Sequence, residues 1–122
     1  MNKEILTAKI KDEVLDSMAR FMLSYNEDGE EPPYTQEDID TCESILKDYV
    51  EALFSLTDKD DDPIMSEVEK VVIKLNELNE ELDYSLIETE ERESIAIFIQ
   101  ECAVICGLKN IPDDVTEEWR EW

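Results

Sequence analysis

The spacing of apolar residues constrains this chain most, because it repeats at three and four residues with few interruptions. Only two glycines and four prolines occur, and they fall between the apolar stretches. Such a period is typical of amphipathic helices, and no segment has the strict alternation of a half-buried strand. The sequence therefore predicts an all-α fold, a four-helix bundle-like single domain over residues 1–122 with a short helical turn at its C-terminus.

Breakers and caps bound the first two predicted helices. The first runs from about Lys3 to Tyr25 and ends before the Pro32–Pro33 pair, which cannot continue a helix. The second begins at Thr35, with Asp38 three residues on as a variant of the capping box. We expect the following residues to line the inner side of the first helix: Ile5, Leu6, Ile10, Val14, Leu15, Met18, Phe21, Met22 and Tyr25.

The remaining helices are bounded by similar signals. The third is expected to begin at Pro63, whose missing N–H suits a first turn, with Asp62 as its cap. Thr89 is expected to cap the fourth, and Gly107 is its natural C-terminal stop. Short loops predict mostly antiparallel neighbours. A last turn after Pro112 would place Val115, Trp119 and Trp122 on one side.

The charge is strongly one-sided. The chain holds 34 acidic and 11 basic residues, a formal net charge of −23. Such an excess favours attraction to basic surfaces. It disfavours direct binding to nucleic acid and to an anionic membrane, which carry the same sign. We therefore predict a basic protein as partner, with no direct nucleic-acid binding and no membrane binding.

The acidic excess is also unevenly placed. Residues 1–25 contain four acids and four bases, whereas residues 27–43 contain eight acids and no base. Acids without compensating lysines destabilise a helix surface, so this segment is a candidate for partner binding. Trp122 joins it as a candidate, because tryptophan is over-represented at binding hot spots. The predicted partner-binding residues are Glu27, Asp28, Glu30, Glu31, Glu37, Asp38, Asp40 and Trp122.

Most catalytic chemistries are excluded by composition. The chain has no histidine, which removes histidine base catalysis and histidine–metal ligation. Two isolated glycines cannot form a phosphate-binding loop. We expect no enzymatic activity and no cofactor. The three cysteines imply no disulfide framework, and no apolar run approaches the roughly 18 residues of a membrane span. These features favour the cytoplasm.

One segment has the spacing of a calcium loop. Asp58, Asp60, Asp62, Ser66 and Glu69 match positions one, three, five, nine and twelve of an EF-hand. Position six, where the loop needs glycine, is Pro63, whose φ is locked near about −65°. We favour an acidic linker and keep calcium binding by Asp58, Asp60, Asp62 and Glu69 as the alternative.

Several short stretches carry a family resemblance. These are Pro33-Tyr34, Ile39-Asp-Thr-Cys-Glu-Ser-Ile-Leu46, Leu75-Asn-Glu-Leu78, Ile87-Glu-Thr-Glu-Glu-Arg-Glu-Ser-Ile95 and Arg120-Glu-Trp122. Through them residues 21–122 resemble the bacterial helical family called domain of unknown function 5713. The resemblance implies a single helical domain and brings no activity or site residues.

Three functional hypotheses follow. The first is an inhibitor of the immunity-protein type that neutralises a basic enzyme, for instance a nuclease. The second is a phage DNA mimic, in which residues 27–43 and 58–62 supply part of a row of carboxylates. The third is a structural subunit whose neutral first helix pairs with a second copy as a homodimer. Regular carboxylates on one extended face favour the mimic, whereas a compact acidic patch around an apolar pocket favours immunity.

Overall fold

The protein folds as a bundle of helical rods. The computed structural model describes residues 3–122, and this range contains helices and turns but no strand. Met1 and Asn2 of the predicted domain lie outside the described residues. The helices are α1 (Lys3–Lys9), η1 (Ile10–Leu15), α2 (Asp16–Glu27), α3 (Gln36–Ser55), α4 (Asp61–Glu81) and α5 (Thr89–Ile105). Because α1, η1 and α2 are continuous, they form one rod, and α3, α4 and α5 are the other three. These four rods confirm the all-α, bundle-like fold.

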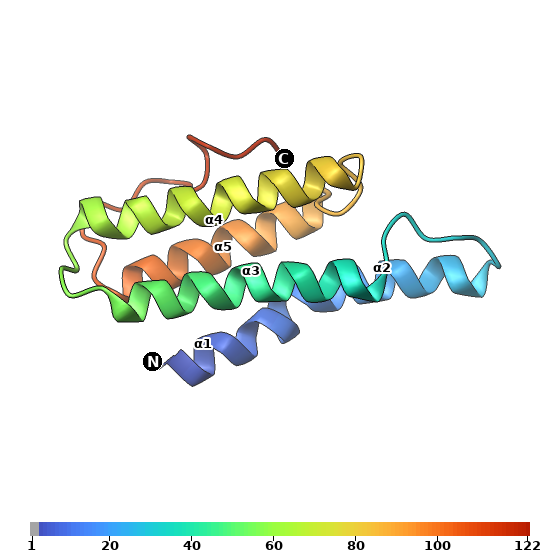
Figure 1. Ribbon diagram of the computed structural model, residues 1–122, viewed down its shortest axis with the longest axis horizontal. Coiled ribbons are helices and arrows are strands. Elements are labelled where there is room, and N and C mark those ends of the chain that lie inside the picture. The colour runs from blue at the N-terminus through green and yellow to red at the C-terminus, as the bar shows by residue number, and fades with distance from the viewer. Residues whose placement is uncertain (1–2) are drawn as a thin grey trace.

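The rods run in alternating directions (Figure 1). The first rod and α3 lie side by side, α4 packs against α3, and α5 contacts η1, α2, α3 and α4. The predicted antiparallel arrangement is thus confirmed. The far end of α2 projects beyond the ends of α4 and α5 (Figure 1), so this end has fewer neighbours to cover it.

The first rod contains a π-helix that the sequence did not predict. In η1 the backbone is wider than in an α-helix, and the adjacent residues Val14 and Leu15 are both buried. Two residues predicted to face inward are instead exposed, Ile5 at 48% and Phe21 at 40%. Phe21 lies on the projecting end of α2, where it packs against Tyr25 and Tyr34 with ring centroids 5.2 and 6.1 Å away.

Two of the four predicted helix starts need correction, and one is confirmed in atomic detail. Thr35 caps α3: its hydroxyl accepts from the backbone N–H of Asp38, whose carboxylate accepts from the Thr35 N–H at 2.9 Å. The helix α4 begins at Asp61, so Pro63 lies in its third position and Asp62 is not the cap. This placement costs no hydrogen bond, because the first four N–H groups of a helix have no partner within it.

The fourth predicted helix starts one residue earlier than expected. Its N-cap is Glu88, not Thr89, and the Glu88 N–H donates to the Glu91 carboxylate at 3.2 Å. Its predicted end is confirmed: Gly107 has a φ of +119°, and the Leu108 N–H donates to the Ala103 carbonyl at 3.0 Å. This is the left-handed termination that glycine permits without strain.

The predicted C-terminal turn is confirmed as a single turn. The N–H groups of Trp119 and Arg120 both donate to the carbonyl of Thr116, at 3.2 and 3.0 Å. Val115 is buried, and Trp119 and Trp122 pack, half-buried, against the core. The chain end lies over α4 (Figure 1).

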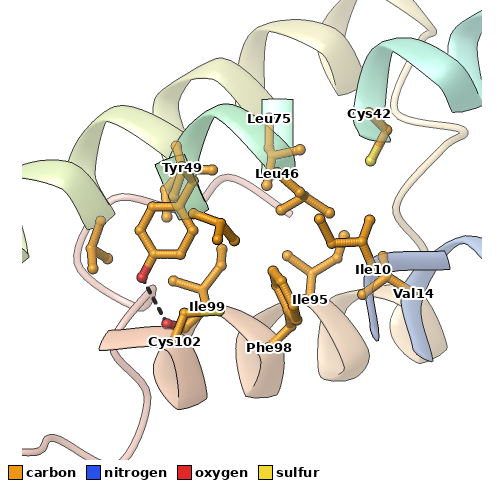
Figure 2. Packing of buried hydrophobic residues seen from close by; sticks show 14 of the residues in the cluster. Ile10, Val14, Cys42, Leu46, Tyr49, Leu75, Ile95, Phe98, Ile99 and Cys102 are labelled. Carbon is orange, nitrogen blue, oxygen red and sulfur yellow. Dashed lines mark hydrogen bonds between the residues drawn. The ribbon is translucent and has the colours of Figure 1, made fainter. Parts of the chain in front are cut away.

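The core fills the space between all the rods. Figure 2 shows Ile10, Leu46, Leu75 and Phe98 converging from η1, α3, α4 and α5, and each of them is fully buried. The Tyr49 hydroxyl reaches across the core and donates to the Ile99 carbonyl at 2.7 Å (Figure 2). A buried hydroxyl needs such a partner, since leaving it unpaired costs about 1–3 kcal/mol. The three cysteines, Cys42, Cys102 and Cys106, are free and buried.

Candidate functional site

A groove with acidic walls runs between the first rod and α3. Its volume is about 390 Å³, and we call it the acidic groove. The residues that line it are Lys11, Asp12, Leu15, Asp16, Ala19, Gln36, Ile39, Asp40 and Glu43. Four of these nine side chains are carboxylates and one is a lysine, so the lining carries a net negative charge.

The groove combines an apolar floor with charged walls. Leu15 and Ile39 are almost completely buried, at 6% and 2% exposure, where the first rod meets α3. On the walls Asp12 and Asp40 are exposed to solvent. A long cationic side chain suits such a groove, because its aliphatic stem can cover apolar surface while its charged head meets carboxylates.

Helix geometry explains why the carboxylates gather there. Asp12 and Asp16 are four residues apart, and Asp40 and Glu43 are three apart, spacings that bring side chains to one side of a helix. Like charges at these spacings destabilise a helix slightly. Asp12 belongs to η1, and π-helical turns occur frequently at functional sites. The carboxylates of the groove wall therefore slightly destabilise their own helices, and the fold does not require them at these positions.

Two of the four carboxylates have cationic neighbours. Asp16 pairs with Arg20 at 2.9 Å and Glu43 with Lys47 at 3.6 Å, both within their own helix and partly exposed. Exposed pairs of this kind contribute little, about 0.3–0.5 kcal/mol. Asp12 and Asp40 form no ion pair with any of the described residues, and Asp40 only accepts a hydrogen bond from the Gln36 amide at 3.0 Å.

The predicted partner-binding acids gather at one end of the bundle. Glu27 ends α2, three more lie in the exposed loop that follows, and three lie in the first turns of α3. These seven are Glu27, Asp28, Glu30, Glu31, Glu37, Asp38 and Asp40. Asp38 is engaged in the cap with Thr35. Only Asp40 belongs to the acidic groove.

Trp122 does not join the predicted acids. The chain end lies over α4, well away from the α2–α3 loop (Figure 1). Its ring packs against the core, and the indole Nε1 is buried without a hydrogen-bond partner in the described part of the chain. The structure therefore separates Trp122 from the acidic segment with which it was grouped.

Sequence reasoning missed Asp12 and Asp16 because it treated the first helix as neutral. Its charges in fact lie on different sides. Lys9 pairs with Glu101 of α5 at 2.5 Å, whereas Asp12 and Asp16 line the groove beside α3. The four-residue spacing of the two aspartates was the available signal, and it becomes meaningful only when α3 is known to lie beside it.

The calcium-loop candidates are not arranged as an EF-hand. Asp58 and Asp60 lie in the α3–α4 loop, where the Asp58 carboxylate accepts from the Asp60 N–H at 3.0 Å. Asp62 and Glu69 lie on α4, which already begins at Asp61, so the second half of the loop is helical. Within residues 3–122 no group of three or more acidic or cysteine side chains is placed to hold a metal ion.

Asp61, which is not one of the calcium-loop candidates, has a structural role. Its carboxylate accepts from the backbone N–H groups of Lys109 and Asn110, at 2.8 and 3.1 Å, and from the Asn110 amide at 2.7 Å. These bonds, led by the one from Lys109, lower the pKa of Asp61. The acidic linker thus joins the start of α4 to the segment that follows α5.

Comparisons with known proteins do not assign a function to this site. No family model, curated protein or solved structure matches the chain. The resemblance to the uncharacterised helical family therefore stays a prediction. Among the described helices, none is both long enough and apolar enough to cross a membrane.

Proposed function

We propose that this chain binds a basic protein and inhibits it, in the manner of an immunity protein that neutralises a toxin enzyme. The observation that carries the proposal is the acidic groove, in which Asp12 and Asp40 are exposed above an apolar floor. The proposal also places the protein in the cytoplasm, where thiols such as the three free cysteines stay reduced.

Charge would act on the rate of encounter. A net charge of −23 attracts a basic surface over a distance limited by salt screening, about 8 Å at physiological ionic strength. Complementary potentials raise association rates towards about 10⁸–10⁹ M⁻¹s⁻¹ at low salt. The half-buried Ala19, beside Leu15 and Ile39 in the groove lining, would add a small apolar contact that salt does not weaken.

The form of the acidic surface favours immunity over DNA mimicry. The acidic segments 27–43 and 58–62 fall at opposite ends of α3, whose 20 residues span about 30 Å. Between them Lys47 interrupts the carboxylates on the exposed side of α3. A compact acidic patch around an apolar pocket is the arrangement expected of an inhibitor of a basic protein.

The structure also weakens the argument for a homodimer through the first helix. The apolar side of that rod is used within the chain, where Leu6, Ile10 and Val14 are fully buried. A second copy would bring another charge of −23 to the contact. Self-association remains a prediction that gel filtration at high salt tests.

Affinity capture tests the proposal. Tagged protein is incubated with a lysate of its native host at low ionic strength, and bound proteins are eluted with increasing salt. The proposal expects a basic protein that elutes with salt and whose activity the chain inhibits. Recovery of no basic protein, or binding insensitive to salt, would contradict it. If duplex DNA competes with the chain for a DNA-binding enzyme, mimicry is the better account.

A further inference from the structure

Two apolar residues are exposed on the outward side of α5. Ile97 and Val104 are 64% and 39% exposed, and Ile97 is the most exposed large hydrophobic residue in the described part of the chain. They are seven residues apart, a spacing that places them on one stripe of the helix. A helix packed on only one side normally carries polar residues on the other, so packing within the bundle does not explain this stripe.

A second groove, separate from the acidic groove, lies beside this stripe. Its volume is about 360 Å³, and we call it the α5 groove. Its lining consists of Ala96, Ile97, Gln100, Glu101, Val104, Ile105, Asp113 and Asp114. Its floor comes from α5, and its far wall is the segment that contains Asp113 and Asp114.

That far wall is held in place by hydrogen bonds. The Gln100 amide oxygen on α5 accepts from the Val115 N–H at 3.1 Å. The Asp114 carboxylate accepts from the N–H and the hydroxyl of Thr116, at 2.9 and 2.6 Å, and from Arg120 at 3.1 Å. The groove is therefore already formed in the free protein, which lowers the cost of ordering it on binding.

The charge at the rim selects the occupant. Three carboxylates, Glu101, Asp113 and Asp114, line the groove, and no lysine or arginine does. Glu101 and Asp114 already pair with Lys9 and Arg120, which leaves the exposed Asp113 to face a cation. A second copy of this chain, with its charge of −23, is disfavoured by repulsion.

We infer that the α5 groove takes an amphipathic basic helix of the partner. Its apolar side would cover Ile97 and Val104, and a lysine or arginine on its flank would face Asp113. The inference rests on the proposed function and adds a second contact surface to it. Because η1 packs against both α3 and α5, the first rod separates the two grooves. Apolar anchors act mainly on dissociation, whereas exposed charges act on association and salt dependence.

A synthetic probe tests the inference without the natural partner. The probe is a helix of about 18 residues, long enough to be helical in isolation, with leucine on one side and lysine on the other. A matched peptide carries glutamate in place of lysine. Binding is followed by calorimetry, and the contacted surface is mapped by NMR of the isoleucine, leucine and valine methyl groups.

Three single substitutions distinguish binding at the α5 groove from nonspecific hydrophobic binding. Ile97→Ser and Val104→Ser each change an exposed residue of the groove. Ile73→Ser changes a residue of α4 that is 40% exposed, about as much as Val104. We expect the lysine probe to bind about tenfold more weakly to each groove variant with its salt dependence unchanged. Binding to the Ile73 variant should equal that of the parent.

The outcomes distinguish failure of this inference from failure of the proposed function. Methyl shifts confined to Leu15 and Ile39, or equal losses in the Ile73 variant, overturn the α5 contact and leave a basic partner in the acidic groove. Equal binding of the glutamate peptide overturns the charge argument at the α5 groove. If the lysine probe binds at neither groove even at low salt, both proposals fail.

Discussion

The side-chain amide of Asn76 forms hydrogen bonds with the backbone of the C-terminal segment, once as donor and once as acceptor. Its nitrogen donates to the Trp119 carbonyl at 2.8 Å, and its oxygen accepts from the Glu121 N–H at 3.0 Å. Asn76 is 7% exposed and lies in the C-terminal half of α4. These bonds secure the chain end on which Trp119 and Trp122 cover the core.

Replacement of Asn76 should release this segment. In Asn76→Ala the Trp119 carbonyl and the Glu121 N–H lose their partners, and we expect the free energy of unfolding to fall by about 1–3 kcal/mol. The chain's two tryptophans, Trp119 and Trp122, both lie in the segment. Their fluorescence in the native state should therefore shift to longer wavelength, as measured alongside urea unfolding.

Asn79 provides the matched control. Its side-chain oxygen accepts from the N–H groups of Leu86 and Ile87, at 3.2 and 3.0 Å, in the α4–α5 loop. Asn79→Ala should destabilise the protein by a similar amount while leaving tryptophan emission of the native state unchanged. Equal emission shifts in both variants would contradict a local role for Asn76.

The cysteines should be inert until the protein unfolds. Burial raises the pKa of Cys42 to about 12 and also raises the pKa values of Cys102 and Cys106. The thiolate is the reactive form, so a thiol reagent at pH 8 should modify the native protein at the rate at which it opens. In denaturant all three cysteines should react at once. Rapid labelling of any cysteine in the native protein would contradict the burial of all three thiols, two of which, Cys42 and Cys102, are shown in Figure 2.

Asp114 should contribute to stability only when it is ionised. Burial raises its pKa, but hydrogen bonds from Thr116 and Arg120 outweigh that effect, so the pKa lies below the usual value of 3.8. A carboxyl group whose pKa is lower in the folded state stabilises the protein at pH values above its pKa in the unfolded chain, about 3.9. This contribution is lost as the pH falls through the pKa of the folded state. We therefore expect Asp114→Asn to be less stable than the parent at pH 6, and the difference to shrink below about pH 4. A difference that is constant with pH, measured by urea unfolding, would contradict this assignment.

Salt should stabilise the free protein. Like charges that sum to −23 repel one another in the compact state, and salt screens them. We expect the melting temperature to rise between low and high NaCl, by about 4 °C for each kcal/mol of repulsion relieved. The double variant Asp12→Asn, Asp40→Asn, which removes the two unpaired groove carboxylates, should show a smaller rise. A melting temperature that falls with NaCl would mean that ion pairs outweigh repulsion.

Local signals predicted the helices well because each acts within a few residues. Thr35 with Asp38, and Gly107, carry their structural role in their own chemistry. The π-helix was not predictable, since residues 10–15 contain neither glycine nor proline to mark it. The start of α4 was misplaced because Pro63 is tolerated anywhere in a first turn.

The candidate site depended on contacts between distant segments. Asp12 is brought beside Asp40 only by the packing of the first rod on α3. In the same way Asn76, read along the sequence, is an ordinary polar residue of a helix, and its role becomes visible only with the C-terminal segment in place. Charge counted along the chain located the acidic end of the bundle but not the groove.

The most direct test compares two variants of equal charge for binding to the basic protein recovered by capture. One neutralises the groove, with Asp12→Asn, Asp16→Asn, Asp40→Asn and Glu43→Gln. The other neutralises exposed acids of α4 and α5, with Glu77→Gln, Glu80→Gln, Glu81→Gln and Glu93→Gln. Each loses four negative charges, so the net charge of both changes from −23 to −19. Calorimetry should show a Kd weakened more than about tenfold in the groove variant and little changed in its control. Equal weakening of both variants would show that total charge, and not the acidic groove, determines binding.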